Sequence, residues 1–239
     1  MEISSARIAR LLRGVKMGWL RDRIKWLTHP FLVRVANAYY RKSRPYSYNG
    51  IEVMVHPEVF PPHLTLSTKI FLDFLTPLEL SDKRLLELGC GSGIISLYAR
   101  QKGAVVTASD INPIALEYLE NASQSNKLEL RCVQSDLFDG LQKESFDYII
   151  INPPYYPKQA QNIKEQAWFC GVEFEYFQKL FKQLPAFVSS HNHVYMILSE
   201  DCDIEKIKSI AAENNRVITI IHQKKSMGEL NWIFEIQRP

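Results

Sequence analysis

The sequence has few cysteines and no long apolar segment. Its 239 residues include four cysteines, which stand far apart and form no Cys-x-x-Cys pair. This spacing indicates neither a disulfide framework nor a zinc site, and it favours a reducing cytoplasm. The six histidines are scattered, so we expect no metal site. No stretch reaches the roughly 20 uninterrupted apolar residues of a membrane-spanning helix, and basic residues interrupt the N-terminus where a signal peptide has its apolar core. We therefore expect a cytoplasmic protein without a transmembrane segment.

The charge is distributed unevenly along the chain. Residues 1–50 hold eleven basic and two acidic residues, so this segment carries +9, whereas the whole chain carries only +3. We predict that residues 1–50 form a basic extension with helices at 5–27 and 31–40. The basic residues 7–44 suit contact with RNA or the ribosome. Two alternatives stay open: a helix that packs its apolar stripe on the rest of the protein, and a helix that lies on anionic lipid.

Residues 51–239 are predicted to form one α/β domain. The composition of residues 43–50 is typical of a linker, so we place the domain boundary there. A short strand at 51–55 and an amphipathic helix that includes Thr68 come first. We then predict strands at 84–88, 104–109, 128–133, 146–151, 193–198, 216–222 and 231–237, and helices near 93–101, 112–123, 173–184 and 203–213. This alternation indicates a mostly parallel seven-stranded sheet with helices on both faces. The last two strands follow each other without a helix, which indicates an antiparallel hairpin at one edge.

A glycine-rich turn follows the strand at 84–88. Its glycines alternate at Gly89, Gly91 and Gly93, with Cys90 inside the turn. A dinucleotide site would have its third glycine one position later. Glu87 precedes the turn, and a carboxylate there would repel a pyrophosphate but attract the cationic amino-acid end of S-adenosylmethionine.

Two further acidic residues follow strands. Asp110 ends the next strand, where a carboxylate can accept hydrogen bonds from both ribose hydroxyls, and Ile111 can cover one face of an adenine. Asp136, with Leu137 beside it, follows the third strand and offers a carboxylate to the adenine amino group. Ligands bind at the carboxyl ends of strands in open α/β sheets, so we expect these residues to share one site.

The fourth strand runs into Asn152-Pro153-Pro154-Tyr155. The two prolines remove backbone donors and stiffen the loop, which leaves carbonyl oxygens as acceptors. The side-chain oxygen of Asn152 and the carbonyl of Pro153 can each accept one hydrogen from a planar NH2 group, while Tyr155 can stack on that group. Such hydrogen bonds favour a more tetrahedral, more nucleophilic nitrogen in the transition state.

This ordered set of residues resembles the methyltransferase small domain group of class I, Rossmann-like methyltransferases, and in particular the HemK-like glutamine methyltransferases. The resemblance covers roughly residues 51–239. By this resemblance, the methionine part of S-adenosylmethionine would be contacted by Glu87, Gly89, Gly91 and Gly93. Asp110 would contact the ribose and Asp136 the adenine, and the target nitrogen would be contacted by Asn152 and Pro153. Thr68 matches the threonine that begins the helix before the sheet in such proteins. We expect it to bind the cofactor as well, together with Cys90, Ile111, Leu137 and Asn152. The implied activity is methylation of a glutamine amide in a protein; the alternatives are adenine-N6 methylation in RNA or DNA and a non-catalytic S-adenosylmethionine-binding module.

Overall fold

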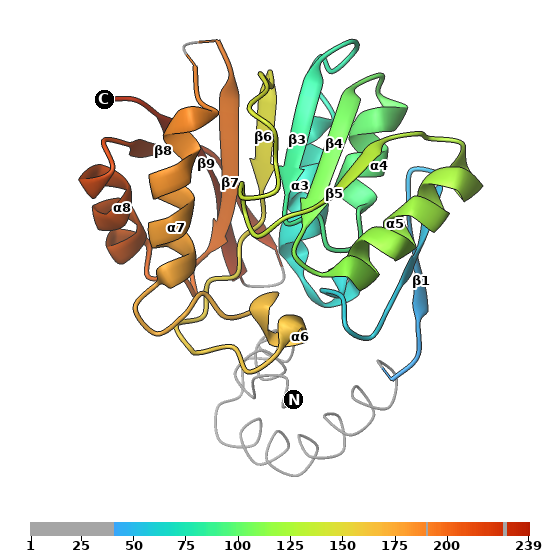
Figure 1. The fold of residues 1–239 in the computed structure, drawn as a ribbon, viewed down its shortest axis with the longest axis horizontal. Helices are drawn as coiled ribbons and strands as arrows, with labels where there is room; N and C mark the ends of the chain where they lie inside the picture. Colours follow the sequence, from blue (N-terminus) through green and yellow to red (C-terminus); the bar gives the residue numbers. More distant parts are fainter. Residues whose placement is uncertain (1–40, 190, 227–228) are drawn as a thin grey trace.

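A parallel sheet with an antiparallel end forms the centre of the protein (Figure 1). The computed structural model describes residues 41–189, 191–226 and 229–239. Within these residues, seven strands form one sheet in the order β5-β4-β3-β6-β7-β9-β8. The strands are β3 (Arg84–Leu88), β4 (Val105–Asp110), β5 (Arg131–Gln134), β6 (Tyr148–Ile151), β7 (His193–Ser199), β8 (Val217–Ser226) and β9 (Glu229–Gln237). The pairs from β5 to β7 are parallel, and β9 pairs antiparallel with both β7 and β8. The predicted fold class is therefore confirmed.

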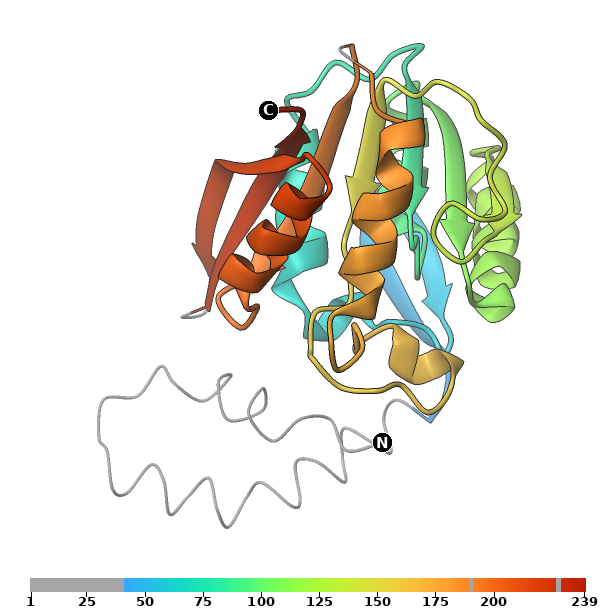
Figure 2. The ribbon, with the colours of Figure 1, turned by 60° about the vertical axis from the view of Figure 1, so that its left-hand side comes forward.

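Helices cover both faces of the sheet. They are α3 (Leu66–Leu75), α4 (Ile94–Gln101), α5 (Pro113–Asn126), the short α6 (Ile163–Gln166), α7 (Glu175–Gln183) and α8 (Ile204–Glu213), with single 3-10 turns at Pro62–Leu64 and Leu184–Ala186. Figure 1 shows α3 and α4 behind the sheet and α7 and α8 in front of it. Figure 2 shows α7 along the sheet with α8 beside it, next to the β8–β9 hairpin.

Alternating strand side chains divide the buried interior into two hydrophobic clusters. On β6, Ile150 joins the cluster with α3, α4 and α5, whereas Ile149 and Ile151 join the cluster with α7 and α8. Successive residues of a strand point to opposite faces, so a strand between two layers of helices must be apolar on both faces. This requirement explains why β6 reads as an unbroken apolar run.

Residues 43–50, interpreted above as a linker, instead contain a strand, so that interpretation was wrong. β1 (Arg44–Tyr48) pairs antiparallel with β2 (Ile51–Val55) in a separate two-stranded sheet. Asn49 and Gly50, which join them, have φ values of 49° and 79°. An Asn-Gly pair with positive φ at both residues is a favoured two-residue hairpin turn. The domain boundary at residue 50 stays a prediction, and the helices predicted at 5–27 and 31–40 lie outside the described residues.

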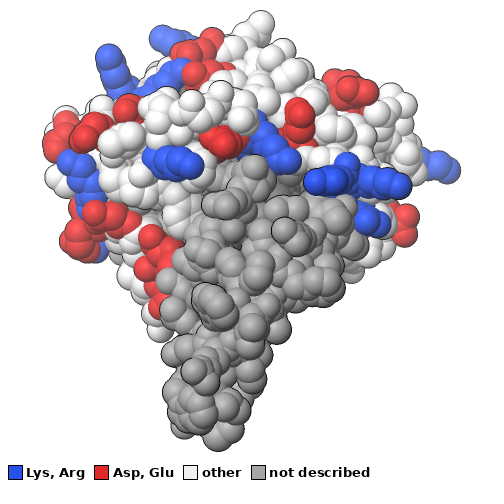
Figure 3. Space-filling view, turned by 90° about the horizontal axis from the view of Figure 1, so that it is seen from below, with Lys and Arg blue, Asp and Glu red and all other residues white. Residues whose placement is uncertain are grey.

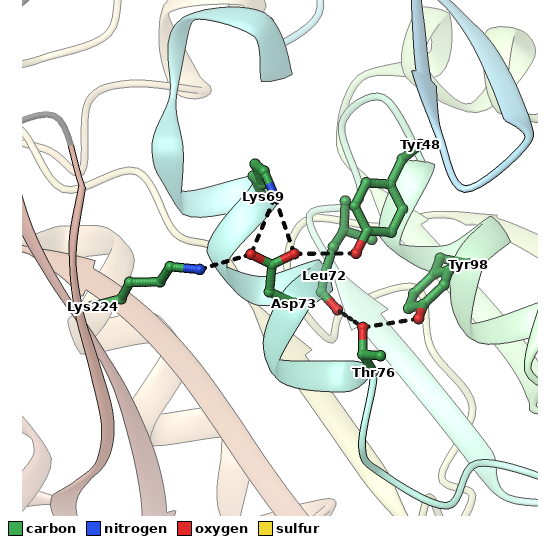
Figure 4. A network of polar contacts seen from close by, with 7 residues as sticks. All are labelled: Tyr48, Lys69, Leu72, Asp73, Thr76, Tyr98 and Lys224. Carbon is green, nitrogen blue, oxygen red and sulfur yellow. Dashed lines mark hydrogen bonds and ion pairs between the residues drawn. The ribbon is translucent and has the colours of Figure 1, made fainter.

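A polar network attaches this hairpin to the main sheet (Figure 4). Asp73 of α3 accepts hydrogen bonds from Tyr48 Oη at 3.2 Å and from Lys224 Nζ at 2.9 Å. Lys69, one helical turn before Asp73, adds a further contact at 3.2 Å. One carboxylate thus joins the hairpin, α3 and the edge strand β8. In the part of the chain that the structure describes, no helix has the length and apolar character needed to cross a membrane.

Candidate active site

A cavity of about 530 Å³ lies at the carboxyl ends of β3, β4 and β6. Its wall combines the glycine turn, the end of β4, the loop after β5, the Asn-Pro-Pro segment and residues from 159 to 179. Figure 1 shows α6 below these strand ends. Segments far apart in the sequence therefore meet at the edge of the sheet where ligands bind in open α/β folds.

The glycine turn is held in a left-handed conformation. Gly89, Gly91 and Gly93 have φ values of 75°, 52° and 71°. The N–H groups of Gly89 and Cys90 both donate to the carbonyl of Ser109 at 2.9 Å, which fixes the turn against β4. No atom lies within 4 Å of the position that a Cβ would take on Gly89, so this part of the turn leaves room for a ligand. A side chain is disfavoured at such φ values, which explains the glycines.

Gly93 has a different role from the other two glycines. It lines no part of the cavity, and a Cβ there would lie 2.3 Å from the nearest methyl carbon of Leu119 in α5. Gly93 therefore permits the start of α4 to lie close to Leu119 of α5.

Glu87 is a buried carboxyl at the base of the cavity. It is 3% exposed, lines the cavity and accepts a hydrogen bond from the hydroxyl of Ser96. Burial raises the pKa of Glu87 to about 8; the hydrogen bond from Ser96 opposes this rise, and the nearby charge of Asp110 adds to it. A buried acid of this kind is stabilised in its charged form by a cation that enters beside it.

Asp110 is fixed by backbone donors. One carboxylate oxygen accepts from the N–H of Gly91 and the other from the N–H of Asn112, both at 2.8 Å. Burial raises the pKa of Asp110, although these hydrogen bonds act in the opposite direction. Ile111 lines the cavity beside it. The carboxylate thus has a fixed orientation at the cavity wall.

Asp136 and Leu137 line the cavity from the loop after β5. Lys179 of α7 contacts Asp136 and Asp139 at 2.6 Å each, and it also lines the cavity. This lysine holds the loop after β5 against α7.

The Asn-Pro-Pro-Tyr segment divides into lining and supporting residues. Asn152 and Pro154 line the cavity, whereas Pro153 and Tyr155 do not. Tyr155 is buried and its ring lies against that of Tyr156 at 4.8 Å between centroids. No described residue hydrogen-bonds the side chain of Asn152. Its amide therefore remains available to a ligand.

The structure brings most of the predicted site residues together. Eleven of them line the one cavity: Thr68, Glu87, Gly89, Cys90, Gly91, Asp110, Ile111, Asp136, Leu137, Asn152 and Pro154. Gly93, Pro153 and Tyr155 lie outside its lining. Sequence reasoning missed Phe60, Asn112 and Lys179, which also line it. Asn112-Pro113 is a helix-start signal that could have drawn attention to Asn112, but no pattern marks the other two.

The sheet order, the glycine turn and the Asn-Pro-Pro-Tyr segment on one cavity define the class I, S-adenosylmethionine-dependent methyltransferases. The methyltransferase small domain family matches residues 50–170, about half of the chain. The chain belongs to this family, as its motifs predicted.

Two curated relatives and one solved structure illustrate the likeness. A protein from Methanocaldococcus jannaschii, named as a protein N5-glutamine methyltransferase, is 34% identical over 109 residues, which cover 45% of this chain and 53% of that protein. Ribosomal RNA small subunit methyltransferase C of Actinobacillus succinogenes is 32% identical over 142 residues, which cover 55% of this chain and 42% of that protein. The chain thus spans about half the length of these relatives. The T. thermophilus 16S rRNA methyltransferase solved with AdoMet and guanosine has a TM-score of 0.59 at 17% identity, covering 83% of this chain and 50% of that chain, and it shares the fold.

Proposed function

We propose that this protein transfers the methyl group of S-adenosylmethionine to a planar NH2 nitrogen, and that the acceptor is a glutamine side-chain amide of a protein. One observation carries the proposal. The glycine turn with Glu87 and the amide of Asn152, which no described residue hydrogen-bonds, line the same cavity, so a cofactor and an acceptor nitrogen can meet there.

The cofactor end of the cavity fits S-adenosylmethionine. Its volume lies within the range of about 300–1,000 Å³ typical of small-molecule sites. Glu87 would face the ammonium group, Asp110 would accept the ribose hydroxyls, and Asp136 would accept the adenine amino group. Ile111 and Leu137 offer apolar contacts to the adenine ring, and Thr68 and Cys90 complete this wall. The bound cofactor supplies a methyl group on a positively charged sulfur.

At the acceptor end, Asn152, which lines the cavity, and Pro153, which lies between two lining residues, would orient the nitrogen. The Asn152 side-chain oxygen and the Pro153 carbonyl would each accept one N–H, which directs the nitrogen lone pair toward the methyl group. Pro154 keeps the segment rigid, and the buried Tyr155 supports it from behind. The proton leaves after methyl transfer, so the reaction needs no strong base at the nitrogen.

The charge of the cavity favours a protein acceptor. Among the described residues that line it are five acids, Glu58, Glu87, Asp110, Asp136 and Glu175, and one lysine, Lys179. That lysine already contacts Asp136 and Asp139. Even with Glu87 protonated, the other four acids outnumber the lysine, so a phosphate near this cavity would meet net repulsion, whereas a neutral amide would not. On the face shown in Figure 3, basic and acidic side chains are mixed around the part that is not described. The M. jannaschii relative named for N5-glutamine methylation supports the same acceptor.

A second acceptor is the exocyclic amine of a nucleic-acid base. The relative named as a ribosomal RNA methyltransferase supports a base as the acceptor. The basic residues 7–44 would then contact RNA or the ribosome; of these, only Arg41, Lys42 and Arg44 lie within the described residues. A non-catalytic S-adenosylmethionine-binding module is the third possibility.

Methyl-labelled S-adenosylmethionine and an extract of cells that lack this protein distinguish the three. We expect transfer of label to material that protease destroys and nuclease leaves intact. Label destroyed only by nuclease would instead identify a base as the acceptor. Binding of the cofactor without any transfer would support the non-catalytic module.

Asn152→Ala tests the catalytic assignment. This variant should bind S-adenosylmethionine like the unchanged protein, because Asn152 faces the acceptor, yet lose methyl transfer by roughly 100-fold or more, as for other groups that act mainly in the transition state. Asn152→Asp keeps the shape and one acceptor oxygen and serves as the matched variant. Full transfer by Asn152→Ala would refute the role of this amide.

A further inference from the structure

Two aromatic rings from distant segments meet beside the cavity. The rings of Phe60, in the loop after β2, and Trp168, in the segment after α6, have centroids 4.7 Å apart and an interplanar angle of 48°. Aromatic pairs in this range stabilise a contact beyond the area that they bury. The pair therefore connects a loop that precedes the Asn-Pro-Pro-Tyr segment in the sequence to a segment that follows it.

Phe60 belongs to the cofactor end of the cavity. It lines the cavity, and its Cβ would lie 3.7 Å from a Cβ placed on Gly91. The loop that carries it is held in place because the amide of Asn112 donates to the carbonyl of Glu58 at 3.0 Å. The N–H of Asn112 also donates to Asp110, so the same residue fixes both the loop and the carboxylate assigned to the ribose.

Trp168 belongs to the acceptor end. Its carbonyl accepts the N–H of Tyr156 at 3.1 Å, and the N–H of Cys170 donates back to the carbonyl of Tyr156 at 2.9 Å. Tyr156 directly follows the Asn-Pro-Pro-Tyr segment. Trp168 itself is not among the described residues that line the cavity.

From this arrangement we infer that Phe60 and Trp168 form an aromatic clasp that couples cofactor binding to the position of the acceptor segment. The inference rests on the proposed function. Phe60 contacts the cofactor and Trp168 acts as a positioning residue through Phe60. A cofactor that fixes Phe60 over the glycine turn also fixes Trp168. The two backbone hydrogen bonds of Tyr156, with Trp168 and Cys170, then fix the segment after Tyr155. Because such coupling is reciprocal, an acceptor that orders this segment strengthens cofactor binding by the same factor.

Binding of S-adenosylhomocysteine, measured by calorimetry on the full chain, tests the clasp without knowledge of the acceptor. Trp168→Ala should weaken binding by roughly 2- to 10-fold, the range expected for loss of one aromatic pair, although its side chain does not line the cavity. Phe60→Ala should weaken binding at least as much. The double variant should be no weaker than Phe60→Ala, since the clasp requires that Trp168 affect the cofactor through that ring. Trp168→Phe keeps a ring and should retain most of the affinity.

A second aromatic pair, at the amino ends of the strands and so away from the cavity, supplies the control. The rings of Tyr148, which begins β6, and His193, which begins β7, stack with centroids 5.6 Å apart, and neither residue lines the cavity. Tyr148→Ala should lower thermal stability yet leave the affinity for S-adenosylhomocysteine unchanged. It thereby separates a loss of the clasp from a general loss of stability.

Amide hydrogen exchange gives an independent measure of the coupling. In the unchanged protein, S-adenosylhomocysteine should slow exchange at Tyr156 and Cys170, whose amides form the two backbone hydrogen bonds. In Phe60→Ala at a saturating concentration of ligand, this protection should be lost while protection of the glycine turn remains.

The outcomes separate the clasp from the proposed function. If the unchanged protein binds no S-adenosylhomocysteine, the cofactor assignment itself fails. If it binds, but Trp168→Ala binds equally well or the two single effects add in the double variant, the clasp is refuted and the cofactor assignment stands.

Discussion

The buried carboxyl of Glu87 should make cofactor affinity depend on pH. Because burial raises the pKa of Glu87 to about 8, the carboxyl is protonated in the free protein at neutral pH. An ammonium group that enters beside it favours the ionised form, so binding below that pKa must release the proton. Affinity for S-adenosylmethionine should therefore increase with pH up to about 8.

The size of this effect follows from the fraction of ionised carboxyl. If only the ionised form binds, affinity at about pH 6 should be roughly 50-fold lower than at about pH 8. Calorimetry in buffers of different ionisation enthalpy should show that about one proton is released per cofactor near pH 6 to 7. Glu87→Gln should remove both the proton release and the pH dependence. Glu175→Gln, at another cavity-lining acid that is exposed, should retain them.

S-adenosylhomocysteine identifies the group that Glu87 faces, because it keeps the ammonium and lacks the positive sulfur. Equal proton release with both ligands would assign the contact to the ammonium. Release with S-adenosylmethionine alone would assign it to the sulfur and overturn the role given to Glu87 here. A flat affinity between about pH 6 and 8 without proton release would refute the whole argument.

The same carboxyl affects stability in the free protein. The folded state binds the proton of Glu87 more tightly than the unfolded chain, whose carboxyl has the ordinary pKa of 4.5. The contribution of Glu87 to the free energy of unfolding is therefore fully present below pH 4.5 and is lost as the pH rises through about 8. Glu87→Gln should reduce this part of the pH dependence in urea denaturation.

Two further predictions concern local backbone and capping. Gly93→Ala should lower the free energy of unfolding by roughly 2–4 kcal/mol, because the alanine would have a strained left-handed backbone and its Cβ would collide with the buried Leu119. Gly50 also has a left-handed backbone, but no atom lies within 4 Å of the position of its Cβ. Gly50→Ala should therefore lower the free energy of unfolding by only about 1–2 kcal/mol. Equal losses in urea denaturation would contradict this account of the contact between Gly93 and Leu119. Asn112→Ala should lower the free energy of unfolding by about 1 kcal/mol in the same measurement, because it removes the acceptor that caps α5. Asn112→Ser keeps a capping oxygen and should lower it by less. No difference between these two variants would show that the cap contributes little to stability.

The sequence predicted the site best where a residue of suitable chemistry stands at the end of a predicted strand. Glu87, Asp110 and Asn152 could be assigned to one site because the carboxyl ends of parallel strands share one edge of the sheet. Gly93 could not be separated from Gly89 and Gly91 in this way, because its role depends on Leu119 in another helix.

Other differences arise from contacts between distant segments. Lys179 reaches the cavity only because α7 packs beside the loop after β5, and no local pattern encodes that contact. β5 begins later than predicted, at Arg131, since the N–H of Leu128 bonds to Ser123 and belongs to the end of α5. The β1–β2 hairpin, by contrast, is encoded locally, because Asn49-Gly50 favours a two-residue turn between two strands.

The position of β6 in the sheet bears on how the protein is synthesised. This strand leads into the acceptor segment, and it is hydrogen-bonded to β3 on one side and to β7 on the other. A nascent chain that has emerged only as far as residue 170 has β3 but lacks β7, so β6 exposes an apolar edge with unpaired backbone groups. Exposed edges of this kind pair readily with other chains and promote aggregation. A recombinant fragment limited to the family-matched residues 50–170 would have the same defect, and expression should therefore extend through β9.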